Sequence, residues 1–264
     1  MKRILITGVS LFALMGAANA ADIYNGSTKD RPVAIEPAAT WTGFYAGVNA
    51  GGAWTQFDTS WTDSGTIGKT PWALTINHTN AADGFAGGGQ LGYNWQTGAF
   101  LLGIESDIGY LGVQQDRKIV AASLGTYGVG VGTRIDSGLL VDVTGRIGWV
   151  SGPALFYAKG GWAYFDGTVG TSGISALAAT LKAKGFADVS KSGLDGWTIG
   201  GGIEYLVSPS WSIKAEYQYF DFGSFDLQPI IVSTTIPALN NNLGVNIAKV
   251  GLNYHLNSGY APLK

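Results

Sequence analysis

The chain has no cysteine among its 264 residues, few charged residues, and no long apolar run after its N-terminus. Without cysteine there is no disulfide framework, so an exported form cannot depend on disulfide bonds for stability. Charged residues make up 13% of the chain and the net charge is −2, which leaves no strong positive field for binding nucleic acid. A membrane-bound form would cross the bilayer as strands closed into a barrel, because lipid offers no hydrogen-bond partner to an open sheet edge.

The first 20 residues have the pattern of a signal peptide. Lys2 and Arg3 precede an apolar stretch at 4–17 that is too short to span a bilayer. Small residues at the end of this segment predict cleavage between Ala20 and Ala21. Residues 21–40 are polar, contain two prolines and show no hydrophobic period, so we expect a disordered linker on the periplasmic side.

Glycine is abundant, with 41 residues, and the segment 83–112 has the clearest strand pattern. Apolar residues alternate with small or charged ones on both sides of a turn at Thr97 and Gly98. One face is apolar with aromatic residues at its ends, and the other carries Glu105 and Asp107. This pattern is typical of a membrane barrel, whose apolar face meets lipid and whose polar face lines the interior.

The same alternation recurs along the rest of the chain and predicts eight strands. They lie at 41–54, 85–95, 100–110, 139–149, 155–165, 195–206, 211–220 and 246–256. Short turns alternate with long segments at 57–82, 113–137, 168–194 and 223–245, which we expect to be extracellular loops. Val-Gly alternation at 128–132 favours strands that continue past the bilayer, and apolar spacing from Ile174 to Leu181 favours a short helix. Residues 41–264 are therefore predicted to form an all-β, eight-stranded antiparallel transmembrane up-and-down barrel.

Outward-facing aromatic residues predict two belts at the membrane interfaces. Those at the short-turn ends are Phe44, Trp95, Phe100, Trp149, Phe156, Tyr205, Trp211 and Tyr254. Those at the long-segment ends are Trp54, Phe85, Tyr110, Tyr164, Trp197 and Tyr219. One strand register places both sets, which supports the barrel and outer-membrane lipid as its surroundings.

The first strand resembles that of the alphaproteobacterial outer-membrane immunogenic protein family, small porin-like surface-antigen barrels, in the run WTGFYAGVNAGG from Trp41. The run KVGLNYHL from Lys249 resembles the family's last strand, and AEYQY from Ala215 is also similar. The resemblance implies a cell-surface barrel of the outer membrane without established catalytic residues, delivered by periplasmic chaperones and the barrel-insertion machinery. Leu256 stands where such barrels usually end on an aromatic residue, and residues 257–264 follow it.

Inward-facing charges nearly balance along the predicted strands. The acidic residues are Glu105, Asp107, Asp142, Glu204 and Glu216, and the basic residues are Arg146, Lys159, Lys214 and Lys249. Unpaired buried charges cost several kcal/mol, so we expect these side chains to pair with one another. An eight-stranded barrel is only wide enough for side chains to fill, which favours a structural barrel and surface antigen with a filled lumen. A small passive porin and a proton relay through the same residues remain as alternatives.

The sequence gives little support for catalysis or for a cofactor. There is no cluster of histidine or cysteine for a metal, and the two histidines, His78 and His255, fall at opposite ends of the predicted barrel. We therefore predict that the protein is not an enzyme, with an outer-membrane hydrolase as the alternative. The G-x-G-x-x-G run at 87–92 lies inside a strand and does not predict a nucleotide site. Apolar residues in the segments 57–82 and 223–245 fit either strand extensions or, by family analogy, a surface that binds a host molecule or a small ligand such as haem.

Overall fold

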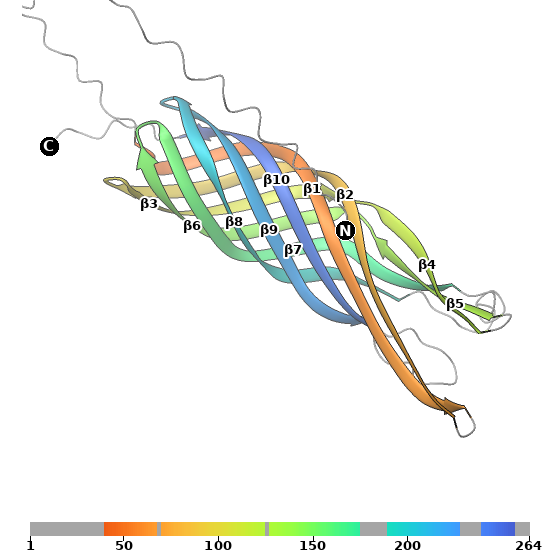
Figure 1. The fold of residues 1–264 in the computed structure, drawn as a ribbon. Coiled ribbons are helices and arrows are strands. Elements are labelled where there is room, and N and C mark those ends of the chain that lie inside the picture. Colours follow the sequence, from red (N-terminus) through yellow and green to blue (C-terminus); the bar gives the residue numbers. More distant parts are fainter. Residues whose placement is uncertain (1–39, 68–69, 125–126, 175–188, 228–238, 257–264) are drawn as a thin grey trace, which may run out of the picture. The chain divides into compact units, whose positions relative to one another are not determined.

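The computed structural model describes residues 40–67, 70–124, 127–174, 189–227 and 239–256, and these residues form antiparallel β-strands (Figure 1). The strands are β1 (Gly43–Ile67), β2 (Thr70–Thr97), β3 (Phe100–Gly112), β4 (Gln115–Leu124), β5 (Tyr127–Ile135), β6 (Gly138–Ser151), β7 (Ala154–Ile174), β8 (Val189–Ser208), β9 (Trp211–Leu227) and β10 (Leu239–His255). No helix in these ranges is long and apolar enough to cross a membrane.

Eight of the strands close into a ring. The sheet order is β4-β5-β7-β6-β3-β2-β1-β10-β9-β8, and an additional pairing between β7 and β8 completes the barrel. At the seam, Leu256 donates its backbone N–H to the carbonyl oxygen of Phe44 at 2.8 Å, so the ends of the described chain meet at one rim. The predicted eight-stranded antiparallel barrel is therefore confirmed.

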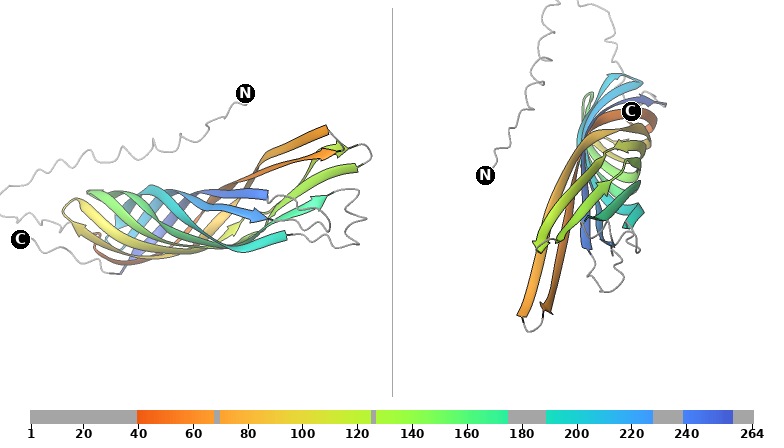
Figure 2. Two further views of the ribbon diagram at one scale, coloured as in Figure 1. Left: turned by 90° about the horizontal axis from the view of Figure 1, so that it is seen from below. Right: turned by 90° about the vertical axis from the view of Figure 1, so that its right-hand side faces the viewer.

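β4 and β5 lie outside this ring as a hairpin. Residues Gly130–Ile135 of β5 pair with Val169–Ile174 of β7, beyond the point where β6 begins. Two views show this hairpin and the β1–β2 hairpin continuing past the barrel at the same end (Figure 2). The strand continuation expected from the Val-Gly alternation at 128–132 is thus present in β5.

The described residues of the segment 57–82, which we expected to be a loop, are strand. β1 and β2 remain paired as far as Ile67 and Thr70, and β1 has 25 residues where crossing a bilayer takes about 9–11. The loop prediction, made from polarity, glycine and Pro71, was therefore wrong, whereas the alternative of strand extensions past the bilayer is confirmed for this segment; a strand in water can be polar on both faces. Threonine, tryptophan and isoleucine in this segment favour extended backbone.

The segments 168–194 and 223–245 are also partly strand. β7 runs to Ile174 and β8 starts at Val189, while β9 runs to Leu227 and β10 starts at Leu239. The predicted helix after Ile174, the signal peptide, the linker up to residue 39 and the tail 257–264 lie outside the described residues.

Tight turns join the strands at the other end. Thr97 pairs with Phe100 and Ser151 pairs with Ala154. Gly98 and Gly152 adopt φ of +62° and +57° in these turns, a left-handed conformation that glycine reaches without the steric penalty of a Cβ. Glycine at these positions therefore allows the two tight turns.

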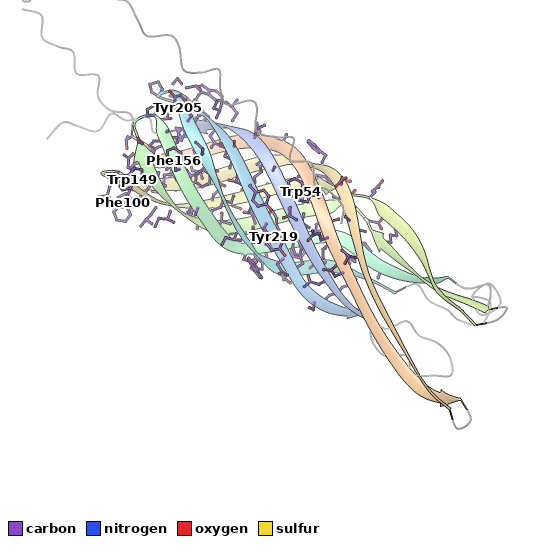
Figure 3. All side chains as sticks on the ribbon, viewed as in Figure 1. Trp54, Phe100, Trp149, Phe156, Tyr205 and Tyr219 are labelled. Atoms are coloured by element: carbon purple, nitrogen blue, oxygen red, sulfur yellow. The ribbon has the colours of Figure 1, made fainter. Side chains whose placement is uncertain are left out.

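The outer wall of the barrel is apolar and carries the two predicted aromatic belts. All eight aromatics predicted at the short-turn end are exposed, from 42% for Trp211 to 64% for Trp95. At the other end Trp54 is exposed, whereas Tyr164 and Tyr219 are half-buried. Figure 3 shows Phe100, Trp149 and the other labelled aromatics in two separate zones along the barrel. Such belts mark the levels of the two membrane interfaces.

Inside the barrel, two apolar clusters lie on either side of a polar layer. The short-turn cluster consists of Trp41, Leu101, Leu155, Tyr157 and Leu206. The loop-end cluster consists of Ala53, Ala82, Ala86, Leu111, Val113, Ile135, Leu140, Ala163, Phe165, Val169, Leu194, Phe220, Phe222, Leu243, Val245 and Ile247. The order of the three layers can be followed along β3, whose inward residues run from Leu101 through Glu105 and Asp107 to Leu111.

Candidate functional site

All nine predicted charged residues lie buried in the middle of the lumen, and we call them the charged layer. They occupy inward positions, at period two, on β3, β6, β7, β8, β9 and β10. The layer is built from six of the eight strands of the ring, so its members are brought together by barrel closure and not by sequence proximity.

Glu105 is one of two carboxylates in the charged layer that each contact three cations. It is fully buried, and its oxygens lie 2.7 Å from Lys159 Nζ, 3.2 Å from Lys214 Nζ and 3.5 Å from an Arg146 nitrogen. The hydroxyl of Tyr45 donates to Oε2 at 2.7 Å. A Cβ at Gly92 would lie 2.2 Å from this hydroxyl oxygen, so glycine at that position gives the tyrosine ring its space.

Glu216 is a second centre of cation contacts. One of its oxygens lies 3.1 Å from both Lys159 Nζ and Lys249 Nζ, and the other lies 3.4 Å from Lys214 Nζ. Tyr157 donates its hydroxyl to the latter oxygen at 2.6 Å. Shared cations thus link this carboxylate to Glu105 across the lumen.

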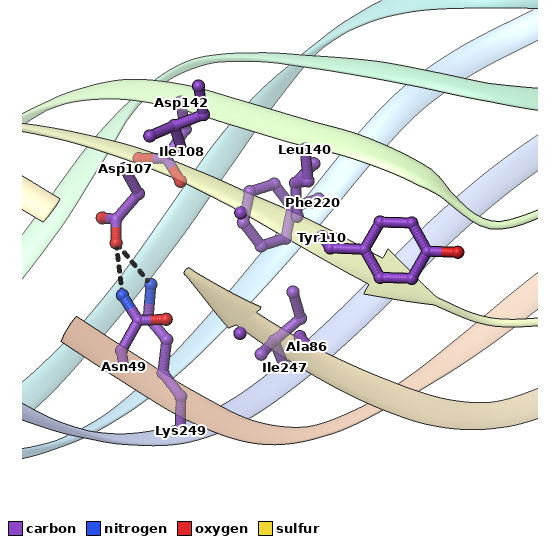
Figure 4. A pocket seen from close by; sticks show the side chains of 12 residues that line it. Asn49, Ala86, Asp107, Ile108, Tyr110, Leu140, Asp142, Phe220, Ile247 and Lys249 are labelled. Carbon is purple, nitrogen blue, oxygen red and sulfur yellow. Dashed lines mark hydrogen bonds and ion pairs between the residues drawn. The ribbon is translucent and has the colours of Figure 1, made fainter. Parts of the chain in front are cut away.

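Asp107 joins the same group from β3. Its two oxygens lie 3.1 Å from Lys159 Nζ and 3.2 Å from Lys249 Nζ, and Asn49 donates to it at 2.8 Å. Figure 4 shows the contacts with Asn49 and Lys249 at the boundary of the loop-end cluster. Lys159 therefore touches three carboxylates.

Glu204 and Arg146 extend the charged layer toward the short turns. The carboxylate lies 3.2 Å from an Arg146 nitrogen and accepts hydrogen bonds from Asn253, at 2.6 Å, and from Ser212. The guanidinium also lies over the ring of Tyr45, 4.6 Å from its centroid. Planar, permanently charged Arg146 thus combines a carboxylate contact with a cation–π contact in a dry environment.

Asp142 differs from the other four carboxylates. Among the described residues, no cation nitrogen lies within 4 Å of it; Gln218 donates to Oδ2 at 3.3 Å, and Oδ1 has no hydrogen-bond partner. The side chain is 2% exposed and lines a cavity of about 30 Å³ together with Asp107 and Lys249. Five carboxyl groups therefore face four basic side chains, and among the described residues Asp142 is the carboxyl group without a basic partner.

The strand register shows which charged residues lie opposite one another on neighbouring strands. Lys249 lies directly opposite Glu216 on β9, which gives an attractive neighbour on the wall. Asp107, however, lies opposite Asp142, and like charges in such positions are destabilising. Lys159 offsets this repulsion by reaching from β7 across β6 to the carboxylates of β3.

Several polar partners of the charged layer were not assigned a role from the sequence. Tyr45 and Tyr157 supply hydroxyl donors, and Gln90 donates to Asn253, which in turn donates to Glu204. These residues share the inward period of the charges, and that period is the signal that could have identified them. Their residue types alone gave no such signal, because tyrosine, glutamine and asparagine are also common on exposed surfaces.

A serine, a histidine and a carboxylate meet at the short-turn side of the layer. Ser212 Oγ lies 2.9 Å from His255 Nε2 and donates to Glu204, whose nearest oxygen lies 3.7 Å from the same Nε2. In a catalytic triad the carboxylate orients the histidine through Nδ1 while Nε2 faces the serine. All three side chains are also buried, so this arrangement lacks both the relay geometry and access for a substrate.

The described residues contain no group of three or more histidine, cysteine, aspartate or glutamate side chains that could hold a metal ion. His78 lies on β2 opposite Thr59, far along the strand from the rim where His255 pairs with Tyr45. The two histidines thus belong to opposite ends.

A closed barrel with an apolar outer wall, aromatic belts and a polar interior is the architecture of an outer-membrane protein. The family described as outer membrane protein beta-barrel domain matches residues 7–255, and the chain belongs to this family. It is 30% identical over 258 residues to the 31 kDa outer-membrane immunogenic protein of Brucella melitensis, covering 96% of this chain and 99% of that protein.

A second relative is the 22 kDa outer membrane protein of Rhizobium leguminosarum biovar viciae, 32% identical over 231 residues, or 85% of this chain and 88% of the relative. Among solved structures, OprG from Pseudomonas aeruginosa matches with a TM-score of 0.47 and 11% identity, covering 81% of this chain and 97% of that chain. The predicted family and the outer-membrane location are confirmed, and the apolar wall contacts lipid.

Proposed function

We propose that the protein is a structural barrel of the outer membrane with a sealed, non-conducting lumen, which presents its extended hairpins at the cell surface. The observation that carries this proposal is the succession of layers inside the ring. A charged layer whose side chains contact one another lies between two apolar clusters, and all of these side chains are buried. An ion entering the lumen would have to cross an apolar cluster, where it has no ligand to replace its hydration.

The remaining parts of the chain fit this role. Residues 1–20 direct export and are cleaved between Ala20 and Ala21; residues 21–40 link the barrel to the periplasm; and periplasmic chaperones with the barrel-insertion machinery deliver it. The long connections lie on the extracellular side of the membrane, since barrels of this class have short turns on the periplasmic side. Surface display as an antigen is supported by relatives named immunogenic proteins.

We also infer that the protein is not an enzyme. Ser212, His255 and Glu204 act as a hydrogen-bonded cluster that fills the lumen, because the carboxylate approaches the wrong nitrogen for a relay. The charged layer serves the same filling role, and its shared contacts leave each cation fixed between carboxylates.

Conductance in planar lipid bilayers tests the sealed lumen. The purified mature protein is incorporated into one set of bilayers, and a 16-stranded porin, which leaves an aqueous channel, is incorporated into separate bilayers as the positive control. We expect no current steps above the bare bilayer, with insertion verified by heat-modifiable gel migration of protein recovered from the membrane. Steady nanosiemens steps would instead establish the small passive porin.

A further inference from the structure

Trp41 fills the short-turn end of the lumen. Its side chain is fully buried in the short-turn cluster, although the residue precedes β1 and takes no part in the sheet. The indole ring meets the ring of His255 edge-on, with 5.5 Å between the centroids. The residue that covers this end is thus supplied by the segment leading into the barrel, and not by the wall.

The backbone at the start of β1 directs Trp41 inward. Gly43 has φ of +138°, a conformation that other residues rarely adopt, and the chain changes direction there. Two hydrogen bonds hold the segment: Trp41 N–H donates to Gln96 Oε1 at 2.9 Å, and Gln96 N–H donates to Thr42 Oγ1 at 3.0 Å. Gln96 therefore acts as the latch of this segment.

The contacts of Trp41 also suggest how the segment opens. Its indole Nε1–H is buried, and no acceptor among the described residues contacts it; this is unusual for tryptophan and lowers the stability of the closed position. Opening breaks no ladder hydrogen bond, since sheet pairing begins at Gly43. Chain segments outside the sheet open at lower free energy than the sheet itself.

Behind Trp41 lies a continuous polar route into the charged layer. His255 contacts Ser212, Ser212 donates to Glu204, and Glu204 contacts Arg146. Because Trp41 packs directly on His255, its departure would expose the first member of this route to water. The loop-end cluster would still close the opposite side.

We propose that Trp41 is a removable stopper, which controls the access of water and small solutes from the short-turn end to the charged layer while the loop-end cluster prevents passage through the barrel. This inference rests on the sealed lumen proposed above. The barrel then contains a closed-ended vestibule, and residues 40–42, through which the preceding chain is attached, control its opening.

The reactivity of a single thiol tests this proposal, because the natural chain has no cysteine. Ser212→Cys places a thiol directly behind the stopper, and the mature chain in lipid nanodiscs is treated with a small cationic methanethiosulfonate reagent. We expect slow labelling in this background and an acceleration on the order of 100-fold when Trp41→Ala is added, since truncating a buried tryptophan removes most of the packing that holds the closed position. Trp41→Phe keeps an aromatic stopper and should stay close to the parent rate.

Matched controls separate stopper loss from general loosening. Trp211→Ala removes an exposed belt tryptophan at the same end and should leave the labelling rate unchanged. Ala163→Cys, in the loop-end cluster, should stay protected in the Trp41→Ala background. If that second thiol also reacts, Gln96→Ala decides the matter, because it removes the side-chain acceptor of Trp41 N–H while keeping the backbone bond to Thr42, and it should accelerate labelling at position 212 alone.

Two results would overturn the stopper. One is rapid labelling at position 212 with Trp41 in place; the other is an unchanged rate in both Trp41→Ala and Gln96→Ala. If either result is found and the unmodified protein gives no current steps in planar bilayers, the stopper is refuted but the sealed lumen is not. Current steps from the unmodified protein would contradict the sealed lumen itself.

Discussion

Two amide substitutions in the charged layer test whether local contacts or net charge stabilise the lumen. Glu105→Gln and Asp142→Asn each remove one negative charge from buried inward carboxylates on neighbouring strands, so the lumen changes from five carboxylates to four in both variants. Only the surroundings differ: Glu105 has cation nitrogens at 2.7, 3.2 and 3.5 Å, and Asp142 has a single neutral donor at 3.3 Å.

The expected magnitudes follow from these contacts. Glu105→Gln removes one carboxylate shared by Lys159, Lys214 and Arg146, each of which keeps another carboxylate contact, so we expect a destabilisation of up to the roughly 3–5 kcal/mol that a fully broken buried ion pair costs. Asp142→Asn retains an oxygen that can accept from Gln218 and removes a charge that had no partner. The penalty for burying that charge disappears, so we expect a change between zero and a gain of about 1 kcal/mol.

Equilibrium unfolding in guanidinium measures both variants, with tryptophan fluorescence and heat-modifiable gel migration as independent probes of the folded barrel. Both proteins are refolded into the same detergent and compared by midpoint and slope. Equal destabilisation by the two substitutions would refute the contact argument. If Glu105→Gln raised the free energy of unfolding, the net negative charge of the layer would matter more for stability than the local contacts of Glu105.

Three further substitutions test the wall, the loop-end cluster and a turn. Ile104→Lys introduces a charge on the lipid-facing side of β3. If this position lies near the bilayer midplane, the free energy of unfolding from lipid vesicles should fall by about 2–4 kcal/mol. An unchanged unfolding midpoint would show that residue 104 lies outside the hydrocarbon region. Phe220→Ala should cost about 3–5 kcal/mol by leaving a cavity, and a calorimetric melt should show a lower Tm than Phe44→Ala at the exposed rim. Gly98→Ala should cost about 1–2 kcal/mol because of its positive φ, with slower refolding on gels; a value near zero would mean that the turn changes type.

The wall could be predicted from the sequence because it obeys a local rule. Each side chain on β3 or β9 faces lipid or lumen according to its parity, and a stretch such as Trp211 to Phe220 shows that parity without reference to any other strand. The positions of Glu216 and Lys214 on the inner face followed directly. The belts followed too, since aromatic residues close both ends of most runs.

Contacts across the lumen follow no such local rule. Lys159 meets Glu105 across β6, which lies between their strands in the ring, and its three ion pairs are with carboxylates other than Asp142. The loop-end cluster was missed for a different reason. Phe220 and Ile247 continue the inward period, but a polar lumen was expected along the whole strand, so apolar residues on that face carried no interpretation.

The layered interior restricts where any further activity of this protein can be located. The charged side chains lie buried between apolar clusters, so the described part of the barrel presents its apolar wall to lipid, and the proposed vestibule behind Trp41 would add a surface at the short-turn end. β1 and β2 have 25 and 28 residues, so more than half of each extends beyond the length that a bilayer crossing takes, about 9–11 residues. The closed barrel holds the base of this hairpin at a fixed register, so under the proposed orientation recognition outside the cell is to be sought on the extended strands, whose backbone the barrel positions.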